Sequence, residues 1–531
     1  MSRSRHLESV GHAEAASWEA FVAAIQVNLH ASCCGAGGGG ATLARRTAPP
    51  VLFAQGRAGW EASVRSAAPL LPWRRGRFVL PGVRLADPGA PPSAPVDLLI
   101  AEGRIERIAP AGATQASAEV IEALRGHYVA PALADLHVHM PAATVLRLSP
   151  LFLLLTLRHG IVRVRDAGDP DGSATPAALG LVRSGALPGP DIHYAYAFVG
   201  DGRARWGNTL RYADRAEAPA IVARLRAAGA SWVKAYENLD APRIAALVEA
   251  ASDAGLQVMG HVSTGLTIEA ARLPDAQHGF GVPDPATLRR DHVLNRAIDW
   301  QSVTPERIRR VVDACAEHGL AMTPTLSTSR NLLRLADWQR QRAAPDVALL
   351  PRVYPEVIWH PAHGLPAYRD IASADFDRAR DAWDRKLALV AALAGAGVPL
   401  RLGTDTQQPF VVPGAALHTE LAAFAAAGIN RARAWTWASR DAAQLLGVAD
   451  TGRLVEGQLA DLLVSPTAPF DPGWSPSSIS ATLCAGACLM APDLDAAIAR
   501  ELARFEGLFA DHLARWLARF ALNRTAKRFV G

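Results

Sequence analysis

Short apolar runs alternate with longer stretches rich in alanine, leucine and arginine between about residues 129 and 447. The apolar runs predict buried strands at residues 161–164, 192–198, 232–235, 256–259, 320–324 and 398–402. The stretches between them predict helices, among them residues 216–228, 242–254 and 305–318. Helices are expected to end before the next strand at Gly229, Gly255, Gly319 and Gly397. This repetition predicts the α/β class and a (β/α)8 TIM-type barrel over residues 131–447, with a doubly wound sheet as the alternative.

The segments that flank the predicted barrel have a different pattern, with short β-type runs separated by turns. These runs are residues 78–80, 96–100 and 105–108 before the barrel, and residues 452–454 and 460–464 after it. We expect residues 77–130 and 448–490 to combine into one small β-sandwich domain. Residues 1–76 have little periodicity apart from a stretch at residues 16–29 that suits a helix, and we expect a partly disordered N-terminal extension.

Residues 491–531 carry apolar side chains three or four positions apart, which predicts one continuous amphipathic helix. The apolar positions are Leu494, Ile498, Leu502, Phe505, Phe509, Leu513, Trp516 and Phe520. We expect this face to pack on the barrel or on a second subunit, so a homo-oligomer is an open alternative. Binding to a membrane surface is the other alternative.

The composition argues against several classes of partner. Only 20% of the 531 residues are charged, and the net charge of +5 comes without a dense basic run, so we expect no nucleic-acid partner. Five cysteines are sparse and odd in number, which argues against a disulfide framework and favours a cytoplasmic protein. The longest apolar run, residues 148–157, has about half of the roughly 20 residues that a membrane span needs, so no span is expected.

Candidate chemistry begins at the first predicted strand of the barrel, which ends in His137-Val138-His139. Residues two apart on a strand point to the same face, so both imidazoles can reach one metal ion, although this pair alone is more often structural. Further polar residues follow later predicted strands: Lys234, His261, His278 and Asp405. Because the ends of barrel strands converge at one mouth, we expect these six side chains to form a site suited to zinc and related divalent metals.

With their surroundings, these residues resemble the amidohydrolase superfamily of metal-dependent hydrolases. The matching segments are residues 129–139, 160–166, 233–236, 261, 277–279, 323–326, 403–406 and 457–462. Their order and spacing look most like the branch that contains metal-dependent dipeptidases, prolidase-like enzymes and imidazolonepropionase. Two departures are the loop at residues 200–207, which lacks the Gly/His-rich look of the dipeptidases, and Ala132, where the family usually has glycine.

The resemblance implies two divalent metal ions, expected to be zinc. His137, His139 and Asp405 would bind the more buried ion. His261 and His278 would bind the more exposed ion, and Lys234, carboxylated on its amine by carbon dioxide, would bridge both.

The scarcity of lysine supports this role of Lys234 independently. Only three of the 55 basic residues are lysines: Lys234, Lys386 and Lys527. A carbamate requires a primary amine, which arginine lacks, so a lysine at the end of an apolar strand indicates a chemical role. The alternative is a salt-bridged or surface lysine at a frayed strand end.

The resemblance implies hydrolysis of an amide or cyclic amide C–N bond in a small molecule of the dipeptide, N-acyl amino acid or lactam type. A hydroxide bridging the two ions would attack the carbonyl, and Asp405 would accept a proton and return it to the leaving amine. A phosphotriester or ester hydrolase with the same site is the nearest alternative, and a non-catalytic scaffold is another.

The sequence indicates the residues that contact the substrate less clearly than it indicates the metal ligands. Arg203 and Arg205 could grip a substrate carboxylate, although a solvated loop is the more ordinary interpretation in an arginine-rich chain. Tyr236 is the third candidate contact. Residues 326–398 form either a lid or helical packing. His418 and Glu420 lie on a predicted helix after the last strand; they could support the site, but we expect an ordinary helix surface.

Overall fold

The computed structural model describes residues 71–519, apart from residues 114–117, 142, 144–145, 202–205, 289–292, 472, 508–510 and 517. Almost all of the predicted N-terminal extension, residues 1–76, lies outside the described residues.

One sheet combines strands from both ends of the described chain. Its strand order is β17-β16-β15-β5-β1-β2-β3, with β4 paired to β1. The strands are β1 (Phe78–Leu85), β2 (Val96–Ala101), β3 (Arg104–Pro110), β4 (Glu119–Val120), β5 (Tyr128–Pro131), β15 (Leu462–Ser465), β16 (Ala481–Cys484) and β17 (Ala487–Met490). The two flanks meet where β15 pairs antiparallel with β5, in the register Leu463 to Ala130. The predicted β runs at both flanks are thus confirmed, except residues 452–454, while the domain boundaries stay predictions.

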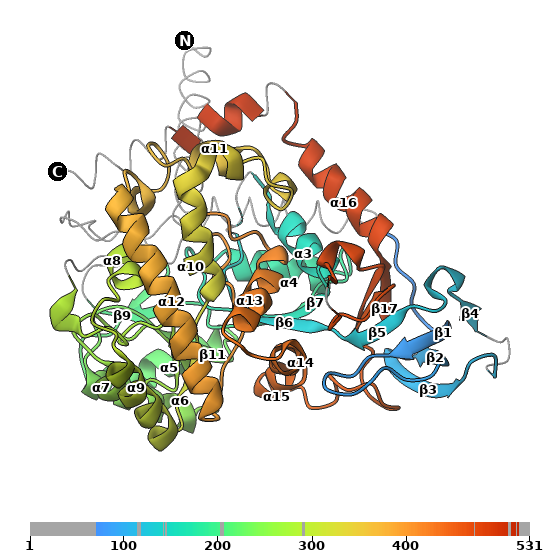
Figure 1. Ribbon diagram of the computed structural model, residues 1–531, viewed down its shortest axis with the longest axis horizontal. Helices are drawn as coiled ribbons and strands as arrows, with labels where there is room; N and C mark the ends of the chain where they lie inside the picture. The colour runs from blue at the N-terminus through green and yellow to red at the C-terminus, as the bar shows by residue number, and fades with distance from the viewer. Residues whose placement is uncertain are drawn as a thin grey trace, which may run out of the picture.

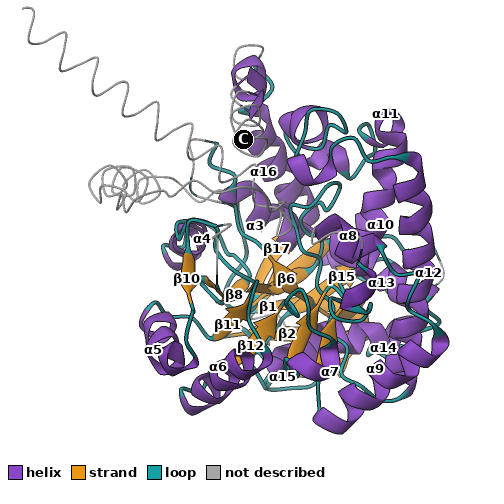
Figure 2. Cartoon of the chain, turned by 90° about the vertical axis from the view of Figure 1, so that its left-hand side faces the viewer, coloured by secondary structure: helices purple, strands orange, loops and turns teal. Residues whose placement is uncertain are grey.

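Two further sheets are parallel throughout, which confirms the α/β class. The first has the order β6-β7-β8, and the second has the order β10-β9-β11-β12-β13-β14. Their bounds are β6 (Leu133–Val138), β7 (Ile161–Asp166), β8 (Asp191–Tyr194), β9 (Phe198–Gly200), β10 (Thr209–Arg211), β11 (Trp232–Ala235), β12 (Gln257–Gly260), β13 (Asp275–Gln277) and β14 (Ala321–Thr323). In Figure 2 the strands occupy the centre and helices surround them.

Two predicted strands of the barrel differ from the structure. The predicted strand at 192–198 is two strands, β8 and β9, because the chain turns between them at Tyr196, where φ is 65°. Residues 398–402 form only an isolated bridge, between Leu400 and Met322. Pro399 has no backbone N–H to donate to a ladder, which explains why no regular strand forms there.

The helices follow the strands as predicted. Before the long central helix they are α3 (Ser149–Arg158), α4 (Ala174–Arg183), α5 (Ala218–Ala227), α6 (Ala241–Asp253), α7 (Ile268–Ala271), α8 (Val293–Ile298), α9 (Pro305–His318), α10 (Leu326–Leu332) and α11 (Trp338–Gln341). The remainder are α12 (Ser373–Gly395), α13 (Ala415–Ala426), α14 (Arg431–Thr436), α15 (Ala442–Leu445) and α16 (Ala491–Ala503). Positive φ angles at Gly229, Gly255, Gly319 and Gly397 confirm the predicted helix ends.

Residues 326–398 contain α10, α11 and α12, joined by short helical turns that include η6 (Tyr354–Ile358) and η7 (Pro366–Tyr368). Helices α10, α12 and α13 pack against one another along one side of the molecule (Figure 1). This segment, called the helical cover below, is therefore largely helical packing.

The prediction of one continuous C-terminal helix is wrong. Helix α16 ends at Ala503, residues 504–507 form a turn, and residues 511–516 are again helical. Phe505 is buried in this turn, and Gly507 has poor helix propensity, so both favour the break. Helix α16 packs on α3 (Figure 1). Within the described part of the chain, no helix combines the length and the apolar character needed to cross a membrane.

Candidate metal centre

Three of the six predicted ligands form a compact buried cluster. His137 lies at the end of β6, His278 directly follows β13, and Asp405 follows Gly403 and Thr404. One ligand atom from each of these residues lies within 4.8 Å of the other two. Nε2 of His137 lies 3.4 Å from Oδ1 of Asp405. Side chains from three separate segments thus meet at one point in the interior, as predicted.

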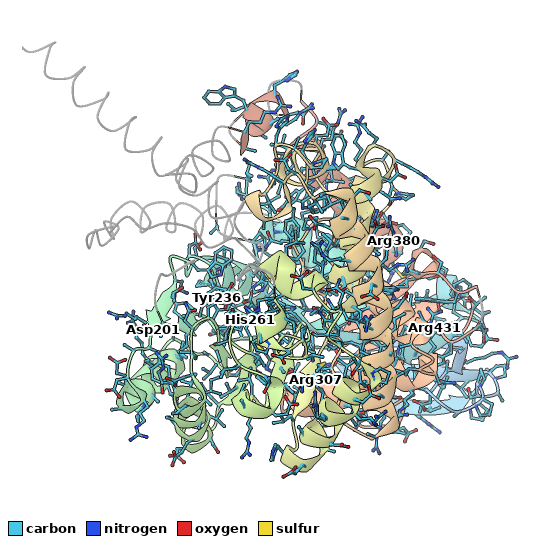
Figure 3. The ribbon with its side chains drawn as sticks, turned by 60° about the vertical axis from the view of Figure 1, so that its left-hand side comes forward. Asp201, Tyr236, His261, Arg307, Arg380 and Arg431 are labelled. Carbon is cyan, nitrogen blue, oxygen red and sulfur yellow. The ribbon has the colours of Figure 1, made fainter. Side chains whose placement is uncertain are left out.

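The other two histidines adjoin this cluster. Nε2 of His139 lies 3.3 Å from Oδ1 of Asp405. The ring of His261 lies 4.9 Å from the ring of His278, and the ring of His278 lies 4.8 Å from that of His137, measured between centroids. Figure 3 places His261 in the interior beside Tyr236, whose ring centroid is 4.6 Å away. The four imidazoles and the carboxylate therefore form one continuous group.

Hydrogen bonds leave the inner face of this group available to a metal. The Nδ1 atoms of His139 and His261 contact the carbonyl oxygen of Gly168 and the carboxylate of Glu237, each at 2.9 Å. With the proton on Nδ1, the lone pair of each ring is on Nε2. Among the described residues, neither Nε2 of His278 nor Oδ1 of Asp405 has a hydrogen bond. Buried polar atoms without hydrogen bonds are costly, and nitrogen and oxygen donors of this kind fit zinc and similar ions.

The backbone at the cluster is strained. His278 has a φ of 63°, Thr325 of 48° and Asp405 of 58°, which are left-handed conformations that side chains other than glycine rarely adopt. Gly403 is required for close packing, because a Cβ atom there would lie 2.5 Å from Cβ of His137. Such conformations persist where the surrounding structure enforces them, and they concentrate at functional sites.

Burial and neighbouring charges keep the imidazoles neutral. Burial, and after it the positive charge of Lys234, lowers the pKa of His137 to about 3. Burial also lowers the pKa of His261 and of His278 well below the usual value. Neutral imidazoles are the protonation state in which histidines bind metals.

Lys234, the sixth predicted residue, lies on β11 and is completely buried. Its ammonium group donates to the side-chain oxygen of Gln277, the last residue of β13. After burial, its positive charge is the foremost cause that lowers the pKa of both His137 and His261. The structure thus brings all six predicted residues together and rejects the alternative of a surface lysine.

Several supporting residues were not anticipated from the sequence. Glu237 holds His261, and Arg296 on α8 donates to both carboxylate oxygens of Glu237, at 3.0 and 3.2 Å. Oγ1 of Thr325 lies 2.7 Å from Nδ1 of His278. The only signal for Glu237 was its position three residues after Lys234, beyond the end of the strand.

Replacing Glu237 with glutamine is expected to weaken metal binding by about 10–100-fold, because residues that orient metal-bound histidines have effects of this size. The measurement is metal retention against a competing chelator. Glu249→Gln, an exposed carboxylate on α6, is the matched control and should retain metal like the wild type. Equal retention in Glu237→Gln would show that its contact with His261 does not support a metal site.

A small cavity of about 40 Å³ opens onto the centre, and His278 and Asp405 are in its wall. Tyr368 of η7 also lines it and donates to the Gln408 side chain at 2.6 Å. Gln408 in turn donates to Oδ2 of Asp405 at 3.1 Å. A hydrogen-bonded chain therefore runs from the helical cover to the carboxylate at the centre.

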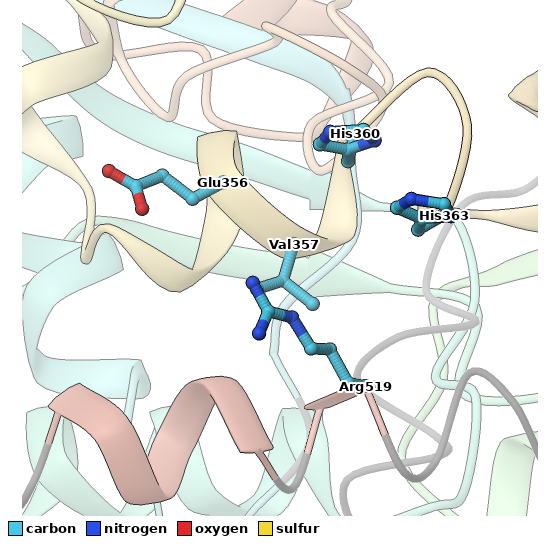
Figure 4. A pocket seen from close by; sticks show the side chains of 5 residues that line it. All are labelled: Glu356, Val357, His360, His363 and Arg519. Carbon is cyan, nitrogen blue, oxygen red and sulfur yellow. The ribbon is translucent and has the colours of Figure 1, made fainter.

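Of the three candidate substrate contacts, the structure describes only Tyr236. Arg203 and Arg205 fall outside the described residues, and Tyr236 is buried against His261, with its hydroxyl accepting a hydrogen bond from Trp206 at 3.2 Å. A larger pocket of about 420 Å³ is lined by residues of the helical cover and by Arg519, but not by the predicted ligands (Figure 4). His363 lines this outer pocket with its ring stacked on that of His360, so it does not face the metal centre.

The expectation that His418 and Glu420 lie on an ordinary helix surface is wrong. Helix α13 packs against α10, α12 and α14, so both side chains are buried. Glu420 accepts hydrogen bonds from the backbone N–H groups of Leu326 and Ser327, at 3.0 and 2.5 Å. It thereby holds the start of α10, next to the Thr325 that contacts His278.

Comparison with known proteins identifies the family. A model of the amidohydrolase family matches residues 128–489, well over half of the chain. The chain therefore belongs to the amidohydrolase family, whose members generally use metal ions. It is a hydrolase that acts on carbon–nitrogen bonds, and the family and its neighbours support hydrolysis of amide bonds.

Solved structures show the same fold at low sequence identity. A bottromycin amidohydrolase is 24% identical, with a TM-score of 0.62, and the match covers 87% of this chain and 95% of that one. A Xaa-Pro dipeptidase with bound methionine in its active site is 17% identical, with a TM-score of 0.56 and coverage of 78% and 100%. A putative prolidase from Bifidobacterium longum is 20% identical, with a TM-score of 0.56 and coverage of 81% and 100%. No curated protein matches the sequence significantly.

Proposed function

We propose that the protein is a binuclear metal amidohydrolase. The observation that carries this proposal is the buried cluster of His137, His278 and Asp405, whose ligand atoms lie within 4.8 Å of one another. His139 would bind the same buried ion as His137 and Asp405. His261 would bind the second ion together with His278, and zinc is the metal that this donor set suits best.

Lys234 is proposed to bridge the two ions as a carbamate. As an ammonium group, it places a positive charge beside imidazoles that are themselves proposed to hold cations. Carboxylation by carbon dioxide would convert this charge from positive to negative and supply two oxygen donors. Because Lys234 is completely buried, little water screens these charges, so such a change would strongly favour bound cations.

The two parallel sheets are proposed to close into an eight-stranded barrel. The two sheets would join at two places. At the first, the N–H of Ser231 donates to the carbonyl of Tyr194 at 3.1 Å, which links the end of β8 to the start of β11. At the second place, residues 399–402 run between β14 and β6. Their hydrogen bonds join Arg401 to Met322 and Leu136 to Leu402, each at 2.9 Å. A closed barrel would bring all strand ends to one mouth.

The ions, when bound, would supply hydroxide from water near neutral pH and polarise the amide carbonyl. Asp405 has two different oxygens for its proposed tasks. Oδ1 faces the Nε2 atoms of His137 and His139, whereas Oδ2 accepts a hydrogen bond from Gln408. We assign ligation to Oδ1 and proton transfer to Oδ2, which would accept a proton and return it to the leaving amine.

Metal analysis of the wild type and of Lys234 variants tests this proposal. Protein supplied with zinc and bicarbonate should contain about two metal ions per chain. Lys234→Arg should lose metal and more than about 100-fold of the activity, because the guanidinium keeps the charge but cannot form the carbamate. Lys234→Ala should be partly rescued by acetate.

Saturation at one ion per chain, with Lys234→Ala unaffected, would overturn the binuclear proposal. The substrate screen should include dipeptides, N-acyl amino acids, lactams, esters and phosphotriesters. Turnover of esters or phosphotriesters without any amide hydrolysis would contradict the proposed substrate type.

A further inference from the structure

Gln408 is a completely buried amide beside the carboxylate of Asp405. Its Nε2 atom donates to Oδ2 of Asp405 at 3.1 Å, and its Oε1 atom accepts from the hydroxyl of Tyr368 at 2.6 Å. A carboxylate oxygen only accepts hydrogen bonds, so the NH₂ group of Gln408 must face Asp405. The amide oxygen then faces Tyr368, whose hydroxyl must donate. Only one orientation of the amide therefore satisfies both neighbours.

The backbone around Gln408 is held by contacts that do not involve Tyr368. Nδ2 of Asn331 on α10 donates to the carbonyl of Phe410 at 3.0 Å. The N–H of Val411 donates to the carbonyl of Gln408 itself at 2.9 Å. The hydroxyl of Tyr368 therefore acts on the side chain of Gln408 and not on its backbone.

Tyr368 reaches this point from the helical cover. It is the last residue of η7, and its backbone N–H donates to the carbonyl of Leu365 at 2.9 Å. Helix α8 packs against η7. Only 7% of Tyr368 is exposed, and it lines the cavity that His278 and Asp405 also line. The hydroxyl that meets Gln408 is thus supplied by the cover and not by the strand ends.

We propose that Tyr368 and Gln408 are positioning residues that hold the carboxylate of Asp405 for proton transfer. This inference rests on the proposed amidohydrolase function, in which Oδ1 binds metal and Oδ2 accepts the proton. A carboxylate can turn about its terminal bond, and the hydrogen bond from Gln408 opposes this rotation. Because a carboxylate oxygen has two lone pairs, the same bond leaves one of them on Oδ2 for the proton. The helical cover therefore takes part in holding Asp405.

A double-mutant cycle tests the proposal on the metal-loaded protein with its best substrate. Tyr368→Phe should lower kcat by about 3–10-fold, the size of one neutral hydrogen bond. Gln408→Met should lower kcat by about 10–100-fold, because the lost bond is to a charged group. In both variants KM should change less than kcat. Because Tyr368 acts through Gln408, the double variant should be no slower than Gln408→Met alone. If Gln408→Met does not fold, Gln408→Asn replaces it in the cycle.

Tyr354→Phe is the matched control. Tyr354 is another buried tyrosine of the helical cover, and among the described residues its hydroxyl has no hydrogen bond. Its replacement should leave kcat and KM unchanged. Two results would overturn the proposal. One is a Tyr368→Phe protein with the kcat of the wild type, and the other is a double variant in which the two separate losses multiply.

A spectroscopic measurement separates this inference from the proposed function. The visible absorption of bound Co²⁺ depends on the geometry of its ligands, and it can be recorded whether or not any amide is hydrolysed. Tyr368→Phe and Gln408→Met should shift this spectrum in the same direction, because the carboxylate of Asp405 is no longer held, whereas Tyr354→Phe should match the wild type. Failure to hydrolyse any amide would contradict the proposed function alone. Identical cobalt spectra in the wild type and both variants would contradict the role of Tyr368 and Gln408 alone.

Discussion

Asp405→Asn is expected to lower kcat by about 10²–10⁴-fold while most of the metal stays bound, since a lost general acid or base typically costs this much. The amide keeps an oxygen at the Oδ1 position, which faces His137 and His139. At the Oδ2 position the variant has no carboxylate oxygen to accept a proton. The measurement is kcat on the best amide substrate, with elemental analysis of the same sample.

His137→Asn serves as the contrasting variant for this prediction. It removes a proposed ligand but leaves Asp405 in place, so metal content should fall together with activity. Near-normal turnover by a metal-replete Asp405→Asn protein would assign proton transfer to another group. His363 is then a poor substitute, because it lines the outer pocket beside His360.

Asp275→Asn is expected to lower the free energy of unfolding by about 3–5 kcal/mol, the usual cost of removing one partner of a buried ion pair. Asp275 is on β13, and Oδ2 lies 2.8 Å from Arg165 and 2.7 Å from Arg401. Arg165 is completely buried over the ring of Trp232. The neutral amide would leave both guanidinium groups without the carboxylate that holds them. Urea denaturation at matched metal content measures the loss.

Two other changes test whether the loss of stability in Asp275→Asn arises because its ion pair is buried. Arg401→Gln should cost less than Asp275→Asn, because the Arg401 side chain is 17% exposed and water can replace part of its interaction. Disruption of the exposed pair between Arg380 and Asp377 should change stability little. Equal and small losses in all three proteins would mean that the buried pair does not stabilise the fold.

Local patterns were sufficient to predict most elements of the fold. Strand β11 and helix α9 have the predicted bounds, because an apolar run and a capped amphipathic stretch are both local signals. The pattern did not reveal the bend at Tyr196, since the apolar residues continue through it. It also did not reveal that Pro399 prevents a regular strand at residues 398–402, because the apolar residues there suited one.

The sequence predicts the proposed metal ligands, because they are polar residues that follow apolar runs. It does not predict the residues that hold these ligands in place. His261 and Asp405 follow apolar runs, and the superfamily resemblance supplied their proposed roles. The partners of these residues could not be predicted, because contacts such as those of Glu237 with Arg296 and of Gln408 with Tyr368 depend on the tertiary fold. The scarcity of lysine in an arginine-rich chain is the signal in the sequence that singled out Lys234.

The small cavity has a consequence for the time course of catalysis. At about 40 Å³, it has room for only a few water molecules, whereas sites for small organic ligands usually measure about 300–1,000 Å³. A substrate of the proposed dipeptide type would enter only if residues that line this cavity, such as Leu294 on α8 and Tyr368 on η7, moved apart. Each catalytic cycle would then include this opening twice, once for substrate and once for product. Where the motion is slower than bond cleavage, turnover depends on solvent viscosity and not on the strength of the amide bond.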